Sequence, residues 1–138
     1  MFGNVVYIDH TLGASEYYTV NQVGPEAIYP LIITDLEAAI QVLPSSVSAN
    51  QIGRATKGAA EALLARVLLF QNDETKMSQV ASLCESVIQS GQYGLLANYE
   101  DIWTKGGEWS SESVFEITYS ENSASDWGSF GWGGGEGN

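Results

Sequence analysis

The sequence predicts a mainly α-helical fold, in which tetratricopeptide-like helical pairs are followed by irregular, aromatic-rich loops and a short strand. Three segments between Pro25 and Gly91 carry apolar residues at three- and four-residue spacing, the period of a helix that is buried along one side. The last two segments are joined by a tight turn and span about one 34-residue unit, the size of a tetratricopeptide pair. After Gly91 the helical period stops, and aromatic and turn-forming residues take its place.

The first helix is predicted over residues 26–43. Its apolar positions recur at helical spacing and are Ile28, Ile32, Leu36, Ala39, Ile40 and Leu43. Pro44 ends this run, because proline cannot supply the N–H that a further helical turn needs. Pro30 lies inside the segment, which indicates that the regular part of the helix begins there.

The stretch "GRATKGAAEALLARVLLF" (53–70) poses a choice between an anion-binding loop and a helix. A phosphate loop needs Ser or Thr directly after its lysine, but Lys57 is followed by Gly58. A helix over 57–71 fits better, because Thr56 can cap its N-terminus. Small residues would allow a neighbouring helix to approach closely, namely Ala59, Ala60, Ala62 and Ala65. The predicted apolar face consists of Leu63, Leu64, Val67, Leu68 and Phe70.

The third helix is predicted over 75–90, antiparallel to the second. Asp73 is its expected N-cap, with Glu74 in the first turn, and Gly91 is its expected C-terminal cap. The predicted buried stripe consists of Met77, Val80, Ala81, Cys84, Val87 and Ile88. Arrays of such pairs need roughly three or more units for stability, so one pair leaves apolar faces without partners and indicates a fragment.

The regions outside the helices are irregular. The N-terminal residues before Pro25 predict at most one short extended piece. The segment "SVFEITY" (113–119) alternates apolar and polar residues and predicts a short strand. The tail beyond it is rich in Gly and Ser, a composition too flexible to form a core element alone.

Composition narrows the classes of function. The 138-residue chain has a net charge of −12, and its five basic residues all lie between Arg54 and Lys105, so nucleic acid is a poor candidate partner. The single cysteine, Cys84, excludes an internal disulfide and a cysteine-cluster metal site. The longest apolar stretch is far shorter than the roughly 20 residues of a membrane span. The start lacks the basic and apolar regions of a signal peptide, so the sequence as written carries no export signal.

The sequence offers no convincing catalytic or metal site. Glu112 and Glu116 would share one face of the predicted strand about 13 Å apart, farther than a glycosidase pair allows. We expect Glu112 to be a hydrogen-bonding residue at the strand start and Glu116 to be a solvent-facing charge. His10, the only histidine, has no nucleophilic elbow beside it. The acidic residues have no calcium-loop spacing, and no cofactor or metal is predicted.

The aromatic residues of the C-terminal part are the best candidates for ligand contact. Trp127, Phe130 and Trp132 stand among glycines and serines, where no helical or strand period requires them. Trp109 follows a Gly pair and is also a candidate for exposure, whereas Trp103 is expected to pack on the helices. The alternative is that the tail aromatics pack onto parts of a longer protein.

Five segments in this order resemble the SusD/RagB family of outer-membrane nutrient-binding lipoproteins of Bacteroidetes. They are "YPLIITDLEAAIQVLP", "GRATKGAAEALLARVLL", "VIQSGQYGL", "YEDIW" and "SESVFEITYS". The resemblance covers about residues 3–120 and implies that 1–138 is part of a single SusD-like domain, with a tetratricopeptide-like core at 25–91 and a loop-rich segment at 92–138. Family members are several times longer, so the chain would be an internal fragment. Cys84, inside the third helix, would not be their lipid-bearing cysteine.

The resemblance also implies binding without catalysis. A SusD-like protein would be a surface-exposed lipoprotein of the outer membrane that captures oligosaccharides and passes them to a SusC-like TonB-dependent transporter. Sugar rings present apolar C–H faces, and flat aromatic side chains are suited to them. The alternative from the residues alone is a helical-repeat scaffold that binds a protein partner through its aromatic residues.

Overall fold

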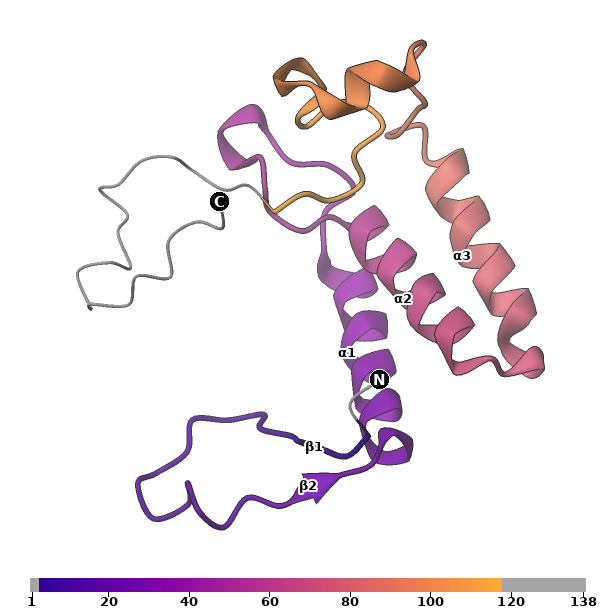
Figure 1. The fold of residues 1–138 in the computed structure, drawn as a ribbon. Helices are drawn as coiled ribbons and strands as arrows, with labels where there is room; N and C mark the ends of the chain where they lie inside the picture. The colour runs from indigo at the N-terminus through magenta and orange to yellow at the C-terminus, as the bar shows by residue number, and fades with distance from the viewer. Residues whose placement is uncertain (1–2, 118–138) are drawn as a thin grey trace.

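The structure is a computed structural model that describes residues 3–117. Its scaffold is a row of three helices, α1 (Pro25–Val42), α2 (Lys57–Gln71) and α3 (Met77–Gln89), in which α2 packs against both of the others. Figure 1 shows α1, α2 and α3 in this order across the molecule, with the loop-rich segment after α3 above their upper ends. The predicted mainly α-helical fold is confirmed.

Helix α1 carries the apolar stripe that the sequence predicts. All six positions of the stripe are half-buried, and no residue of α1 is fully buried. The helix begins at Pro25 and includes Pro30, so the expectation that it becomes regular only at Pro30 is wrong. Pro25 fits the first helical turn, where an N–H has no partner. The missing N–H of Pro30 leaves the carbonyl of Glu26 without its helical partner, and Glu26 is exposed to water.

Helix α2 spans the predicted residues, and it supplies the core. The Thr56 hydroxyl accepts a hydrogen bond from the backbone N–H of Ala59 at 3.3 Å, which confirms the N-cap. The buried hydrophobic residues of the structure are Ala60, Leu64, Ala65 and Leu68. Leu63 and Phe70, expected on the apolar face, are 50% and 67% exposed. The reason is that, within residues 3–117, helices pack on α2 from two sides only, α1 on one and α3 on the other.

Helix α3 follows a 3₁₀ turn, Glu74–Lys76, that Asp73 caps by accepting the backbone N–H of Thr75 at 3.0 Å. The prediction of Asp73 as the N-cap of α3 itself is wrong, because this turn comes between them and Lys76 is the N-cap of α3. Gly91 has a φ of 67° just beyond the helix, as expected of a C-terminal cap. Cys84 is exposed, so the prediction of a small buried residue is wrong. Ala81 and Ile88 of the predicted stripe are also exposed, because within residues 3–117 α3 packs on one neighbouring helix only.

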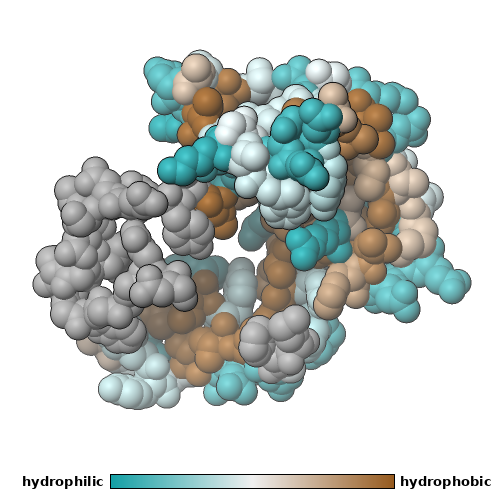
Figure 2. All heavy atoms as spheres, turned by 45° about the horizontal axis from the view of Figure 1, so that its top comes forward, coloured by the Kyte–Doolittle hydropathy of each residue, from teal (hydrophilic) through white to brown (hydrophobic). Residues whose placement is uncertain are grey.

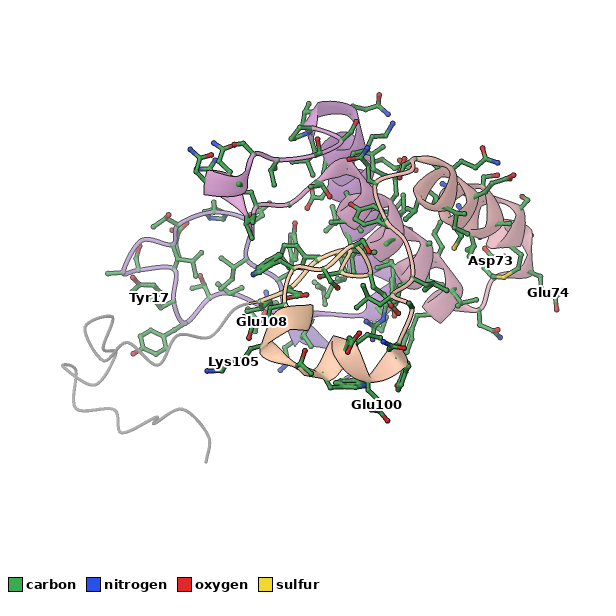
Figure 3. The ribbon with its side chains drawn as sticks, turned by 90° about the horizontal axis from the view of Figure 1, so that it is seen from above. Tyr17, Asp73, Glu74, Glu100, Lys105 and Glu108 are labelled. Carbon is green, nitrogen blue, oxygen red and sulfur yellow. The ribbon has the colours of Figure 1, made fainter. Side chains whose placement is uncertain are left out.

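A two-stranded ribbon precedes the helices. Strand β1 (Val5–Val6) pairs antiparallel with β2 (Gln22–Val23), and Val5 lies opposite Val23. This ribbon accounts for the extended piece expected near the N-terminus. Its connecting loop carries Tyr17 and projects away from the helices, as Figures 1 and 3 show.

The segment after α3 folds into two short 3₁₀ turns, Tyr99–Trp103 and Lys105–Gly107. The strand predicted over 113–119 is not formed over 113–117, because no strand lies beside it in the described part of the chain, and 118 and 119 lie outside that part. No helix within residues 3–117 is both long enough and apolar enough to cross a membrane. Figure 2 shows apolar side chains reaching the surface between hydrophilic ones.

Candidate functional site

Trp109 has an unusual backbone conformation. It directly follows the turn that carries Lys105 and Glu108 (Figure 3), and its φ of 55° places it in the left-handed region that a bulky side chain rarely adopts. Its backbone N–H donates a hydrogen bond to Oε1 of Glu116 at 3.0 Å. Backbone strain of this kind persists only where surrounding contacts hold it, and it is enriched at functional sites.

The indole of Trp109 lies against the loop that leads into α2. A Cβ built on Gly53 would stand 3.6 Å from Cη2 and 3.7 Å from Cζ2 of Trp109, so the edge of the indole is in reach of the Gly53 backbone. Gly53 itself has a φ of 95°, which favours glycine. The indole is thus held from two directions, by this loop and by the Glu116 hydrogen bond to its own backbone.

Three aromatic side chains, Tyr93, Trp109 and Phe115, line a hollow of about 220 Å³ beside this loop. Reciprocal hydrogen bonds bring their segments together, because the N–H of Gly94 donates to the carbonyl of Ser111 and the Ser111 hydroxyl donates to the carbonyl of Gly94, both at 2.9 Å. Trp109 and Phe115 also line a more open depression of about 510 Å³, which shares the Gly53 loop with the smaller hollow. We call these two hollows together the Trp109 site.

Polar groups stand at the rim of the Trp109 site. Arg54, exposed at the surface, lines both hollows and supplies hydrogen-bond donors. Ser113 lines the smaller hollow, and its hydroxyl oxygen is buried without a hydrogen-bond partner within residues 3–117. A buried hydroxyl without a partner is uncommon in folded proteins. Apolar rings with polar groups at the rim suit a neutral, hydroxyl-rich ligand.

The two glutamates near the site serve as structural hydrogen-bond acceptors. Oε2 of Glu112 accepts the backbone N–H of Leu96 at 2.9 Å, which confirms the expected hydrogen-bonding role. Glu116 is half-buried and binds the backbone of Trp109, so its prediction as a solvent-facing charge is wrong. The reason is that residues 113–117 form no strand, so strand alternation does not turn Glu116 toward solvent, and its carboxylate instead reaches the backbone N–H of Trp109.

The remaining predicted residues lie elsewhere. Trp103 is 75% exposed, its ring edge-on to Tyr99 with centroids 6.1 Å apart, so the expectation that it packs on the helices is wrong. Its 3₁₀ turn is short and lies beyond the end of the helical row, which leaves the indole in solvent. Trp127, Phe130 and Trp132 lie outside the described residues.

Other chemistry-bearing groups are remote from the Trp109 site or absent from the described part. His10 pairs with Asp9 at 2.6 Å on the exposed β1–β2 loop, and the hydrogen bond from the His10 side chain lowers the pKa of Asp9. Within residues 3–117, no three His, Cys, Asp or Glu side chains gather in a way that could hold a metal ion.

Sequence reasoning missed Tyr93, Phe115 and Ser113 as members of the site. Tyr93 is held by a 2.9 Å hydrogen bond between its hydroxyl and that of Thr56. The signal available in the sequence was weak: Tyr93 follows the helix-ending Gly91, and Phe115 stood in a segment that was predicted to be a strand.

Comparison with known proteins agrees on one family. No family model matches the chain. SusD-like protein P25 of Formosa agariphila is 23% identical over 123 residues, which cover 88% of this chain and 23% of that protein. A solved laminarin-binding SusD-like protein is 38% identical with a TM-score of 0.79, over 91% of this chain and 28% of that chain.

Two surface glycan-binding proteins A are also similar. The protein from Bacteroides uniformis is 34% identical with a TM-score of 0.77, over 86% of this chain and 26% of that chain. The protein from Bacteroides thetaiotaomicron, solved in complex with laminarihexaose, is 38% identical with a TM-score of 0.67, over 71% of this chain and 21% of that chain. The chain therefore spans about a quarter of the length of these relatives, and the resemblance seen in its sequence is confirmed.

Proposed function

We propose, from the premise that this chain is a segment of a SusD-like protein, that it forms part of a glycan-binding protein of the cell surface. The relatives whose names state a ligand bind laminarin, laminarihexaose or, more generally, glycans. The chain aligns with them along most of its length, and its sequence identity to them is well above the level at which a likeness indicates only a shared fold. Glycan capture without catalysis is the function that these likenesses favour.

The observation that carries the proposal within this chain is the conformation of Trp109. A bulky residue is held in the left-handed region by Glu116 and against the Gly53 loop, beside a hollow with two further aromatic rings. The apolar C–H face of a sugar ring can stack on such a ring while its hydroxyls bind the groups at the rim. Trp109 is therefore our first candidate for a glycan platform.

The finer parts of the proposal rest on the family. We infer that the whole protein is a surface-exposed lipoprotein of the outer membrane and passes its oligosaccharide to a SusC-like TonB-dependent transporter. The chain supports this only through its likeness to SusD-like proteins. Trp127, Phe130 and Trp132 remain proposed ligand contacts on the basis of their sequence setting.

The test is calorimetric titration of the full-length protein with laminarihexaose and a panel of other neutral oligosaccharides. On the scale known for flat ligands on aromatic side chains, losing one platform costs about 1 to 3 kcal/mol. Trp109→Ala should therefore weaken binding about 5- to 150-fold. Trp103→Ala is the matched control, since it removes an exposed indole outside the Trp109 site. Equal affinity of both variants and the parent protein would remove Trp109 from the binding site.

A second candidate function, a scaffold for a protein partner, is favoured by the outer face of α3. Ala81, Cys84 and Ile88 of its apolar stripe are exposed, and Ile88 is 75% exposed. Exposed apolar patches of this kind mark interaction surfaces. A full-length protein that binds no neutral oligosaccharide but binds a protein through this face would favour the scaffold.

A further inference from the structure

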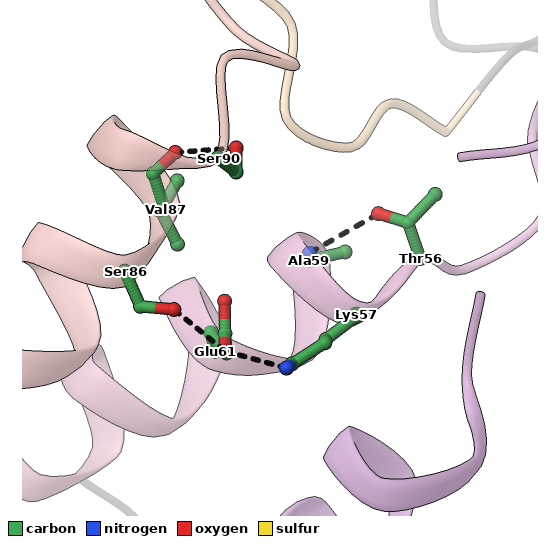
Figure 4. Close-up of polar contacts among 7 residues, drawn as sticks. All are labelled: Thr56, Lys57, Ala59, Glu61, Ser86, Val87 and Ser90. Atoms are coloured by element: carbon green, nitrogen blue, oxygen red, sulfur yellow. Dashed lines mark hydrogen bonds and ion pairs between the residues drawn. The ribbon is translucent and has the colours of Figure 1, made fainter. Parts of the chain in front are cut away.

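A second, polar groove lies directly beside the Trp109 site. It has a volume of about 300 Å³ and runs between the start of α2 and the end of α3. Its walls include the charged Lys57 and Glu61 of α2 and the polar Ser86 and Gln89 of α3. We call it the Glu61 groove, and Figure 4 shows Glu61 between Lys57 and Ser86 in it.

Tyr93 forms a shared wall of the two sites. It lines both the Glu61 groove and the smaller hollow of the Trp109 site, together with Ser45 and Gln92. Its ring rests on α2 where Gly58 lacks a side chain, because a Cβ on Gly58 would stand only 2.6 Å from the Tyr93 hydroxyl oxygen. The hydrogen bond to Thr56 fixes the ring in this position. The two sites thus adjoin each other at Tyr93.

Glu61 is the most unusual member of the groove. It is only 6% exposed, and it is the single buried charged or polar residue within residues 3–117. Oε1 accepts the Ser86 hydroxyl at 3.0 Å and lies 3.8 Å from Nζ of Lys57. Oε2 accepts no hydrogen bond from the described residues.

A purely structural role explains Glu61 poorly. Burying a carboxylate between two helices is costly, and a well-packed apolar residue of similar volume would often stabilise the helix pair as well or better. The hydrogen bond from Ser86 and the charge of Lys57, whose Nζ lies 3.8 Å from Oε1 of Glu61, offset only part of this cost. A carboxylate oxygen that lines a polar groove is instead well placed to accept hydroxyl hydrogen bonds from a ligand.

We propose that the Glu61 groove is a second subsite, which binds the next hydroxyl-bearing unit of the same neutral oligosaccharide beyond Tyr93. Glu61 accepts hydroxyl hydrogen bonds there, and Lys57 and Gln89 donate to ligand oxygens. This inference rests on the proposed function, and it adds that the bound glycan is longer than one stacked sugar. Affinity then depends on oligosaccharide length.

The test is a calorimetric length series, from laminaribiose to laminarihexaose, with the full-length protein. A hydrogen bond to a charged group contributes about 1.5 to 3 kcal/mol. Glu61→Gln should therefore weaken binding of the hexamer roughly tenfold or more and change binding of the dimer by less than twofold. Gln89→Ala removes an exposed side chain, so it tests the same groove without disturbing the core. Glu74→Gln is the charge-matched control, on the α2–α3 turn (Figure 3).

The outcomes separate the two proposals. Loss of hexamer affinity in Glu61→Gln and Gln89→Ala, with normal melting curves and with dimer affinity retained, supports the subsite. Unchanged hexamer affinity in both variants overturns it, while weakened binding in Trp109→Ala keeps the proposed function intact. A parent protein whose affinity does not rise with oligosaccharide length also overturns the subsite. Absence of binding to any oligosaccharide contradicts the proposed function itself.

Discussion

Glu116→Ala should weaken glycan binding although Glu116 need not touch the ligand. The carboxylate accepts the backbone N–H of Trp109 at 3.0 Å and so holds this residue at a φ of 55°. A left-handed conformation costs a non-glycine residue roughly 1 to 2 kcal/mol, whereas a hydrogen bond to a charged group contributes about 1.5 to 3 kcal/mol. In the parent protein the hydrogen bond outweighs the strain.

The magnitude follows from the conformational equilibrium. Without the hydrogen bond, a strain of about 1 to 2 kcal/mol leaves only about 3 to 15% of molecules with Trp109 in its binding conformation. Apparent affinity falls by the same factor, about 6- to 30-fold. The contact between the indole and the Gly53 loop persists in the variant, so we expect the lower end of this range.

The assay is titration of the full-length protein with laminarihexaose, together with the tryptophan fluorescence of each variant. Glu116→Gln retains a side-chain oxygen acceptor and should keep most of the affinity. Glu108→Ala is the control, because Glu108 is exposed on the neighbouring turn. An unchanged affinity in Glu116→Ala would refute the reasoning that Glu116 positions the indole.

Three further predictions concern the scaffold. Ala65→Trp should lower the free energy of unfolding by about 1 to 3 kcal/mol or more, because Ala65 is 4% exposed in the core. Leu69→Trp, at a position that is 56% exposed, should change the melting temperature little. Equal melting temperatures of the two variants would contradict the burial of Ala65. The pKa of Asp73 is lowered from 3.8 by its hydrogen bond with the Thr75 side chain. The stability that this cap gives the folded protein is therefore complete above pH 3.8, and it is lost as the pH falls through the lower pKa of the folded state. Asp73→Ala should therefore melt earlier than the parent at neutral pH but not at strongly acidic pH, and a difference that persists in acid would count against the cap. The 138-residue chain alone should be marginally stable or self-associate, because only four hydrophobic residues are buried within residues 3–117. Sedimentation of the chain as a stable, compact monomer would contradict this prediction.

The helices were predictable because their signals are local. The predicted 57–71 coincides with α2, and 26–43 and 75–90 differ from α1 and α3 by one or two residues at each end. Thr56 and Gly91 fix helix ends through their own backbone and side-chain chemistry, which a sequence displays directly. Burial was less predictable, because the exposure of Cys84 depends on which neighbour α3 packs against and not on its period.

The candidate site was predictable only at Trp109. Gly53, Tyr93 and Trp109 come from three separate loops, with Ser113 in the same segment as Trp109, and no period or fixed spacing connects the three loops. Their assembly depends on contacts such as the Gly94–Ser111 hydrogen bonds, which arise only once the chain has folded. Residues in loops lack the periodic signal that helices and strands carry, so the sequence singled out Trp109 as an aromatic candidate but neither its half-buried position nor its partners.

The most direct test of the central claim, that the Trp109 site binds glycan, is a crystal structure of the full-length protein with laminarihexaose. We predict one sugar ring stacked on the indole of Trp109, near Phe115 and the Ser113 hydroxyl, and the ligand continuing past Tyr93 toward Glu61. A structure in which the oligosaccharide binds elsewhere, while other parts of the protein cover the Trp109 indole, would contradict the claim.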